Sequence, residues 1–147
     1  MFIFQSALET LRKYADFNGR ASRHEFWCFV AFMMIVQAIL GVVGGLFALR
    51  IFAGLIGLLL LVPQASVAVR RLHDIGKPGR ELIVPCVMLS LLPFAFYFRG
   101  ILPKIIALGL LGFTLLAFAN LLTLFLKKGS TVPNKYGAAP TAFSYAG

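Results

Sequence analysis

Charged residues are scarce in this chain of 147 residues. Asp, Glu, Lys and Arg together make up 13% of it, and only five residues are acidic. Hydrophobic residues make up 60%, and the mean hydropathy is +0.90. A soluble domain has about 25% charged and about 45–50% apolar residues. The shortage of charge therefore argues against an ordinary soluble domain and indicates a protein embedded in a lipid bilayer.

Long uncharged runs, by contrast, are abundant. Four runs contain no Asp, Glu, Lys, Arg or His, and they cover residues 26–49, 51–69, 82–98 and 105–126. A helix of about 20 apolar residues crosses a hydrocarbon core of roughly 30 Å. Within lipid every backbone polar group needs a partner in the protein, which leaves helices or closed barrels. Because the runs are continuous rather than alternating, the sequence predicts an all-α integral membrane bundle of four transmembrane helices.

The segment before the first run, residues 1–25, does not fit the pattern of a signal peptide. Acidic residues occur throughout it and precede the first apolar run, whereas a signal peptide has a short basic region followed by an apolar one. Within residues 4–17, apolar side chains from Phe4 to Tyr14 recur at helical spacing. This pattern predicts an amphipathic helix on the membrane surface, with a frayed terminal segment as the alternative.

Lysine and arginine are divided unevenly between the segments that connect the four runs. Residues 1–25, 69–81 and 127–147 fall on one side of the membrane and hold eleven of the fourteen cations. An excess of Lys and Arg marks the cytoplasmic side, so we expect both termini to be cytoplasmic. The net charge of +9 is then a topology signal rather than a footprint for nucleic acid, and it favours contact with anionic lipid headgroups.

Several kinds of chemistry lack their usual residues. The four runs contain no ionisable Asp, Glu, Lys, Arg or His, which counts against a pump or an ion-coupled transporter. Cys28 and Cys86 have no CxxC partner, so we interpret them as ordinary thiols. No zinc-ligand spacing, nucleophile motif or phosphate-binding glycine loop occurs, and no cofactor is predicted. Gln64 and Asn120 are the first polar residues to test as pore or site residues.

The polar residues that do occur form two short islands. One reads FNGRASRHEFW at residues 17–27, and the other reads VRRLHDIGKPGRE at residues 69–81. A hairpin of the first two runs returns both islands to the same membrane face. Residues three apart can share a helix face, which predicts pairing of Arg71 with Asp74 and a common face for Arg20 and Arg23. The candidate site, a cytoplasmic polar cap, consists of Arg20, Arg23, Glu25, Arg70, Arg71, His73 and Asp74.

These islands carry a family resemblance. GRASRHEFW, RRLHDIGKPG and the tail sequence PNKYG at residues 133–137 resemble the three signatures of the YhaH/YhaI-like bacterial inner-membrane proteins, domain-of-unknown-function family 805. The resemblance extends from about Phe17 to Pro140. The family usually continues with Ser-Gly-Trp-Trp after the turn of its second signature, where this chain has Pro78 to Glu81. The resemblance implies a small helical bundle in the bacterial inner membrane and supplies no activity.

The sequence leaves several functions open. The polar cap is either structural, fixing topology and pairing its own charges, or it binds an anionic lipid headgroup or another membrane protein. An alternative is an enzyme at the membrane interface that acts on a phospholipid-like substrate, with His73 as general base, Asp74 as its orienting group and the arginines as a phosphate clamp. A small transporter with the cap as its gate is the remaining alternative.

Overall fold

The described part of the chain is helical. The computed structural model describes residues 10–45 and 49–140. In these ranges the helices are α2 (Arg23–Gly45), α3 (Arg50–Leu59), α4 (Leu61–Asp74), α5 (Ile83–Tyr97) and α6 (Ile101–Leu126), with the short 3-10 helix η2 (Gly79–Leu82) before α5. The described residues form no strand beyond one isolated bridge, between Asn134 and Gly137. The all-α prediction is therefore confirmed.

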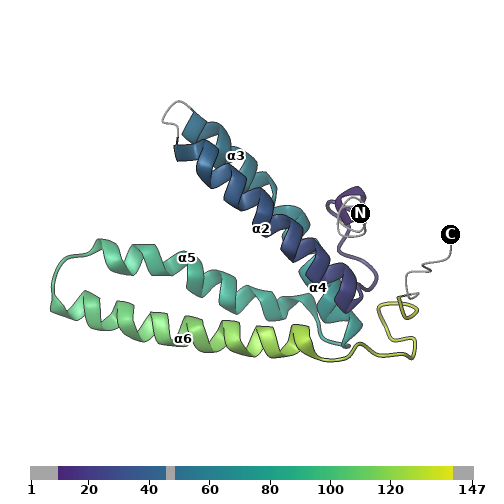
Figure 1. Ribbon diagram of the computed structural model, residues 1–147. Coiled ribbons are helices and arrows are strands. Elements are labelled where there is room, and N and C mark those ends of the chain that lie inside the picture. The colour runs from purple at the N-terminus through teal and green to yellow at the C-terminus, as the bar shows by residue number, and fades with distance from the viewer. Residues whose placement is uncertain (1–9, 46–48, 141–147) are drawn as a thin grey trace.

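The helices form two antiparallel hairpins that diverge from a common end. Helix α2 runs beside α3 and α4, and α5 runs beside α6; the hairpins separate with distance from α4, as Figure 1 shows. In the first hairpin the approach is close, because a Cβ added to Gly44 would lie 3.3 Å from the Cβ of Ala53. The chain segments before α2, after α4 and after α6 all meet at the common end.

The second predicted run is interrupted near its middle. Helix α3 ends at Leu59 and α4 begins at Leu61, with Pro63 in the first turn of α4. Proline has no N–H and its ring crowds the carbonyl four residues earlier, which here belongs to Leu59. That carbonyl instead accepts a hydrogen bond from the hydroxyl of Tyr14. The proline thus provides an attachment point for the segment that precedes α2.

Most of the apolar helix surface is not covered by the protein itself. Three segments are long and apolar enough to cross a membrane, namely Arg23–Gly45, Arg50–Asp74 and Ile101–Leu126. In each, only 17% of the most apolar 18 residues are buried within the protein. Large exposed apolar surfaces need an apolar environment, and a bilayer provides it. The chain is therefore a multi-pass membrane protein. Helix α5 has only 15 residues, so four transmembrane helices are not confirmed.

The predicted surface helix at residues 4–17 is described only in part. Its residues 4–9 lie outside the described residues. Thr10 to Arg12 are helical, and a turn follows them. Thr10 is fully buried, and the hydroxyl of Tyr14 is bonded to the carbonyl of Leu59 at the end of α3. The orientation of this segment on a membrane surface stays a prediction.

The buried core is small and lies at the common end of the hairpins. It joins Phe26, Phe29 and Met33 of α2 to Val67 and Leu72 of α4 and to Leu121, Leu124 and Phe125 of α6. The rings of Phe26 and Phe125 are 4.4 Å apart between centroids. This core brings the end of α4 next to the end of α6, and the polar residues described next lie there.

Candidate functional site

Asp74, the last residue of α4, holds two arginines from different parts of the chain. Its Oδ1 atom accepts hydrogen bonds from Nε and Nη2 of Arg20 at 3.1 and 2.9 Å. Its Oδ2 atom accepts one from Nη1 of Arg71. The side chains of Arg20 and Arg71 are 1% and 0% exposed, and that of Asp74 is 4% exposed. Arg20, Arg71 and Asp74 are called the Asp74 cluster below.

Arg71 also closes the end of helix α6. Its Nε and Nη2 atoms donate to the carbonyl oxygen of Phe125 at 3.3 and 3.1 Å, and Nη2 also donates to the carbonyl of Lys127. The last four carbonyls of a helix have no partner within it and carry partial negative charge. The buried guanidinium of Arg71 supplies these carbonyls with both hydrogen-bond donors and a positive charge. Arg71 therefore connects the hairpin of α2 to α4 with the hairpin of α5 and α6.

Arg20 holds the C-terminal tail, the residues after α6. Its Nη1 atom donates to the carbonyls of Val132 and Gly137 at 3.0 and 3.4 Å, and Nη2 donates to the carbonyl of Ser130. The amide of Ser130 in turn donates to the carbonyl of Asp74 at 2.9 Å. The tail is thus bound to the Asp74 cluster through its backbone.

Arg70 and Glu25 form a second, separate ion pair. Nη1 of Arg70 lies 2.9 Å from Oε1 of Glu25, and the carbonyl of Arg70 accepts a hydrogen bond from the amide of Ala21 at 3.0 Å. The Arg70 side chain is only 2% exposed. Its Nε and Nη2 atoms have no hydrogen-bond partner among the described residues. This pair fastens the start of α2 to α4.

His73 contacts the tail and the segment before α2. Its Nδ1 atom lies 3.1 Å from the carbonyl oxygen of Gly19, which is the geometry of a donated hydrogen bond from that nitrogen. Its ring stacks on Tyr136, with centroids 3.8 Å apart and planes at 4°. The side-chain amide of Asn134 donates to its carbonyl at 2.9 Å. Asn134 and Gly137 close a turn by mutual backbone bonds, and Gly137 has a φ of 125°, which only glycine adopts readily.

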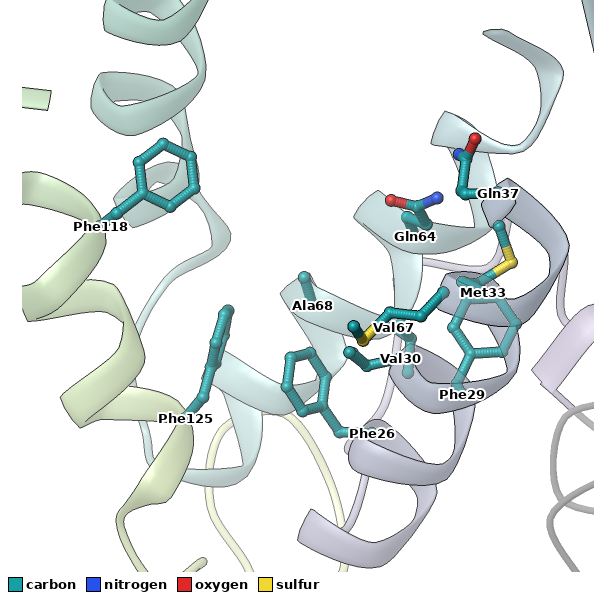
Figure 2. A pocket seen from close by; sticks show the side chains of 11 residues that line it. Phe26, Phe29, Val30, Met33, Gln37, Gln64, Val67, Ala68, Phe118 and Phe125 are labelled. Atoms are coloured by element: carbon teal, nitrogen blue, oxygen red, sulfur yellow. The ribbon is translucent and has the colours of Figure 1, made fainter. Parts of the chain in front are cut away.

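An apolar cleft lies between the two hairpins, as Figure 2 shows. It has a volume of about 540 Å³. Phe26 and Met33 of α2 and Val67 of α4 form one wall, and Phe118 and Phe125 of α6 lie opposite. Two amides, of Gln37 and Gln64, are its main polar groups. Gln37 belongs to α2 and Gln64 to α4. Both lie away from the end where Phe26 meets Phe125 (Figure 2).

Comparison with known proteins identifies the family. The family model described as "Protein of unknown function (DUF805)" matches residues 14–138. The chain belongs to this family. It is 28% identical to inner membrane protein YhaI of Escherichia coli strain K12 over 135 residues, which are 90% of this chain and 92% of the relative. It is 32% identical to inner membrane protein YhaH of the same strain over 76 residues, 48% of this chain and 63% of the relative. No solved structure matches the chain significantly.

In this DUF805 protein the residues of the predicted polar cap divide into separate groups. Arg20, Arg71 and Asp74 form one group, while Glu25 pairs with Arg70 instead. The predicted shared face of Arg20 and Arg23 is wrong, because α2 begins only at Arg23 and Arg20 lies in a non-helical segment. Arg20 is buried, whereas Arg23 is exposed. The two arginines therefore have different environments despite being three residues apart.

The His73–Asp74 pair required by the enzyme hypothesis does not form in the described structure. Both carboxylate oxygens of Asp74 are held by arginines, and the Nδ1 atom of His73 is directed at a backbone carbonyl. A carboxylate that orients a general base must bond to the base itself. Within the described residues, no group of three or more His, Cys, Asp or Glu side chains is placed to hold a metal ion.

Sequence reasoning missed the partners that the tail supplies in this DUF805 protein. Gly129, Ser130 and Val132 contact the Asp74 cluster, and none of them was a candidate residue. Two of these contacts are made by backbone carbonyls, which every residue carries, so no residue type marks them. The PNKYG motif, which includes Asn134 and Tyr136, was noted in the tail only as part of the family resemblance.

Proposed function

We propose that the protein is a non-enzymatic, four-span inner-membrane protein that binds a transmembrane helix of a partner protein between its two hairpins. In this proposal both termini are cytoplasmic, and the Asp74 cluster is a structural clamp that keeps the hairpins joined at one end. The observation that carries the proposal is the pair of glutamine amides, Gln37 and Gln64, in an otherwise apolar cleft between helices.

The case for a fourth span rests on the continuity of η2 and α5. Together they cover 19 consecutive residues, Gly79–Tyr97, all but two of them uncharged. At a rise of about 2.0 Å per residue in η2 and 1.5 Å in α5, their combined length is about 30 Å, the thickness of a hydrocarbon core. Helix α5 also packs along α6, which is itself long enough to span. The charge distribution of the sequence supports the cytoplasmic assignment of both termini.

The case for a clamp rests on how fully the cluster is engaged. The arginines bond to Asp74 and to carbonyls of Phe125, Lys127, Ser130 and Val132, and both are buried. Guanidinium groups that are hidden from solvent and bond to the protein through every nitrogen have little to offer a ligand. A buried pair of this kind is strongly destabilising to break, because the partner left behind is an uncompensated charge.

The case for a helix as the bound partner rests on the amides. A side-chain amide in lipid is costly to leave without a hydrogen bond, and polar side chains of this kind bond across neighbouring transmembrane helices. The side-chain amides of Gln37 and Gln64 make no hydrogen bond with other described residues. The apolar remainder of the cleft is suited to a helix rather than to a charged solute. A partner helix with one hydrogen-bonding side chain at matching depth meets both conditions.

Photo-crosslinking in native membranes tests this function. A benzophenone amino acid replaces Met34, which lines the cleft, or Ile39, an exposed residue of α2 that does not line it. We expect a discrete protein adduct from position 34, no such adduct from position 39, and loss of the adduct when Gln37→Leu and Gln64→Leu are combined. Adducts to lipid alone, or a protein adduct that persists without the two amides, contradict the proposal.

A further inference from the structure

A second groove lies on a different face of α2, outside the cleft and the Asp74 cluster. It has a volume of about 420 Å³. Arg23, His24, Trp27, Cys28 and Ala31 of α2 line it, together with Leu126 at the end of α6. From Arg23 to Ala31 it follows two turns of helix, which is about 12 Å. The end of the groove at Arg23 is cationic, and the end at Ala31 is apolar.

Arg23 is the principal polar side chain of this groove. It is exposed and takes part in none of the ion pairs that the described residues form. Its Nη1 atom donates a hydrogen bond to the carbonyl of Leu126 at 3.3 Å. That bond fixes the guanidinium at the place where α2 begins and α6 ends. Arg23 thus lines the groove without a carboxylate partner among the described residues.

Two further cations follow the groove residue Leu126 in sequence. Lys127 and Lys128 follow Leu126 directly, and both are exposed. Glu25, the nearest acid in sequence, is directed elsewhere, because its carboxylate pairs with Arg70. No acidic side chain lines the groove. The charges of Arg23 and the two lysines are therefore left without compensation by the described residues of the groove.

The apolar part of the groove, at Trp27 and Ala31, indicates which kind of anion fits. Trp27 lies one turn further along α2 than Arg23. Tryptophan is favoured at the boundary between headgroups and hydrocarbon. Ala31, one turn further along α2, is a small residue of the groove lining. A phospholipid has the same order of parts, with a phosphate at the interface and acyl chains below it. Free phosphate has no apolar group that could contact Trp27 and Ala31.

From this arrangement we infer that the groove binds an anionic phospholipid, with the phosphate on Arg23, Lys127 and Lys128 and an acyl chain beside Trp27 and Ala31. Clustered basic residues at the inner membrane face attract anionic lipids. Guanidinium and ammonium groups both form charge-assisted bonds to phosphate. The groove and the cleft have different lining residues, so lipid binding can be tested separately from the proposed function.

Lipid titration followed by native mass spectrometry tests the site on the full-length protein in mild detergent. Phosphatidylglycerol is compared with phosphatidylcholine of the same chain length. We expect preference for phosphatidylglycerol, and a loss of about tenfold in its affinity for Arg23→Ala, because that variant removes a charged hydrogen-bond donor. Equal affinity for the two lipids in the unaltered protein overturns the inference.

Matched variants separate a local effect from a general loss of charge or fold. Lys127→Gln/Lys128→Gln removes the two exposed charges that follow Leu126, and Lys77→Gln/Arg80→Gln removes two exposed charges elsewhere. We expect only the first pair to weaken phosphatidylglycerol binding. Equal effects of both pairs overturn the inference, as does full displacement of the lipid by millimolar inorganic phosphate. Gln37→Leu/Gln64→Leu is expected to bind phosphatidylglycerol normally, which distinguishes this site from the cleft.

Discussion

Gly129 lies so close to Asp74 that a Cβ atom on residue 129 would overlap the Oδ2 atom of the carboxylate. The backbone of the tail passes directly over the buried acid at this point, which is the position that a side chain would otherwise occupy. Glycine here is required by space rather than by backbone conformation, since its φ is not among the positive values of the chain. The contact connects the tail to the charge at the centre of the cluster.

Gly129→Ala is therefore expected to destabilise the protein by roughly 3 kcal/mol, because the added methyl group displaces Asp74 from at least one arginine. The free energy of unfolding in mixed micelles, measured by titration with a denaturing detergent, checks this value. Gly112→Ala in α6 is the control, because a Cβ there meets nothing within 4 Å. Equal stability of the two variants would show that the tail moves aside freely.

Arg71→Ala is expected to lower the free energy of unfolding by about 3–5 kcal/mol, since it leaves Asp74 short of one partner and the end of α6 uncapped. Arg71→Lys is expected to recover only a small part, because an ammonium group does not bond to Asp74 and the α6 carbonyls together. Lys77→Ala is the control: its pair with Glu81, at 3.7 Å, is half exposed and is expected to contribute less than about 1 kcal/mol. A fully stable Arg71→Lys variant contradicts the clamp.

Tyr136→Ala is expected to loosen the tail while leaving the helices intact. The stacked pair with His73 contributes about 0.5–1.5 kcal/mol, which is enough to change the population of a detached tail but not to unfold the bundle. Limited trypsin digestion followed by mass analysis measures cleavage after Lys135. Tyr136→Phe keeps the ring and is expected to resist trypsin as the unaltered protein does. The same cleavage rate in all three proteins argues against the stacking.

The topology is expected to place Lys135 and Arg99 on opposite sides of the membrane. In a variant with Cys28 and Cys86 replaced by alanine, a single cysteine at position 135 is expected to react with an impermeant maleimide only after the cells are opened. A cysteine at position 99, between α5 and α6, is expected to react in intact cells. Labelling of both positions from the same side would show that α6 does not cross the membrane between them as proposed.

The sequence predicted the site unevenly, and the reason differs from residue to residue. The pairing of Arg71 with Asp74 was predictable, because residues three apart on a helix are neighbours whatever else the chain does. Arg20 bonds to the same carboxylate across 54 residues, and no local spacing encodes that distance. His73 and Asp74 are adjacent in sequence and yet serve different partners, since consecutive helical residues point in different directions.

The sequence by itself determined the class of this protein. Scarce charge and long uncharged runs require a lipid environment and helical backbone pairing, since these follow from the sum of local properties along the chain. Only the tertiary structure decided which arginines are buried, which one remains exposed beside Trp27, and where the tail closes over Asp74. These outcomes depend on backbone carbonyls and on the distance between segments far apart in sequence. Backbone carbonyls are the same in every residue, so only the folded arrangement decides which of them are bonded by the arginines.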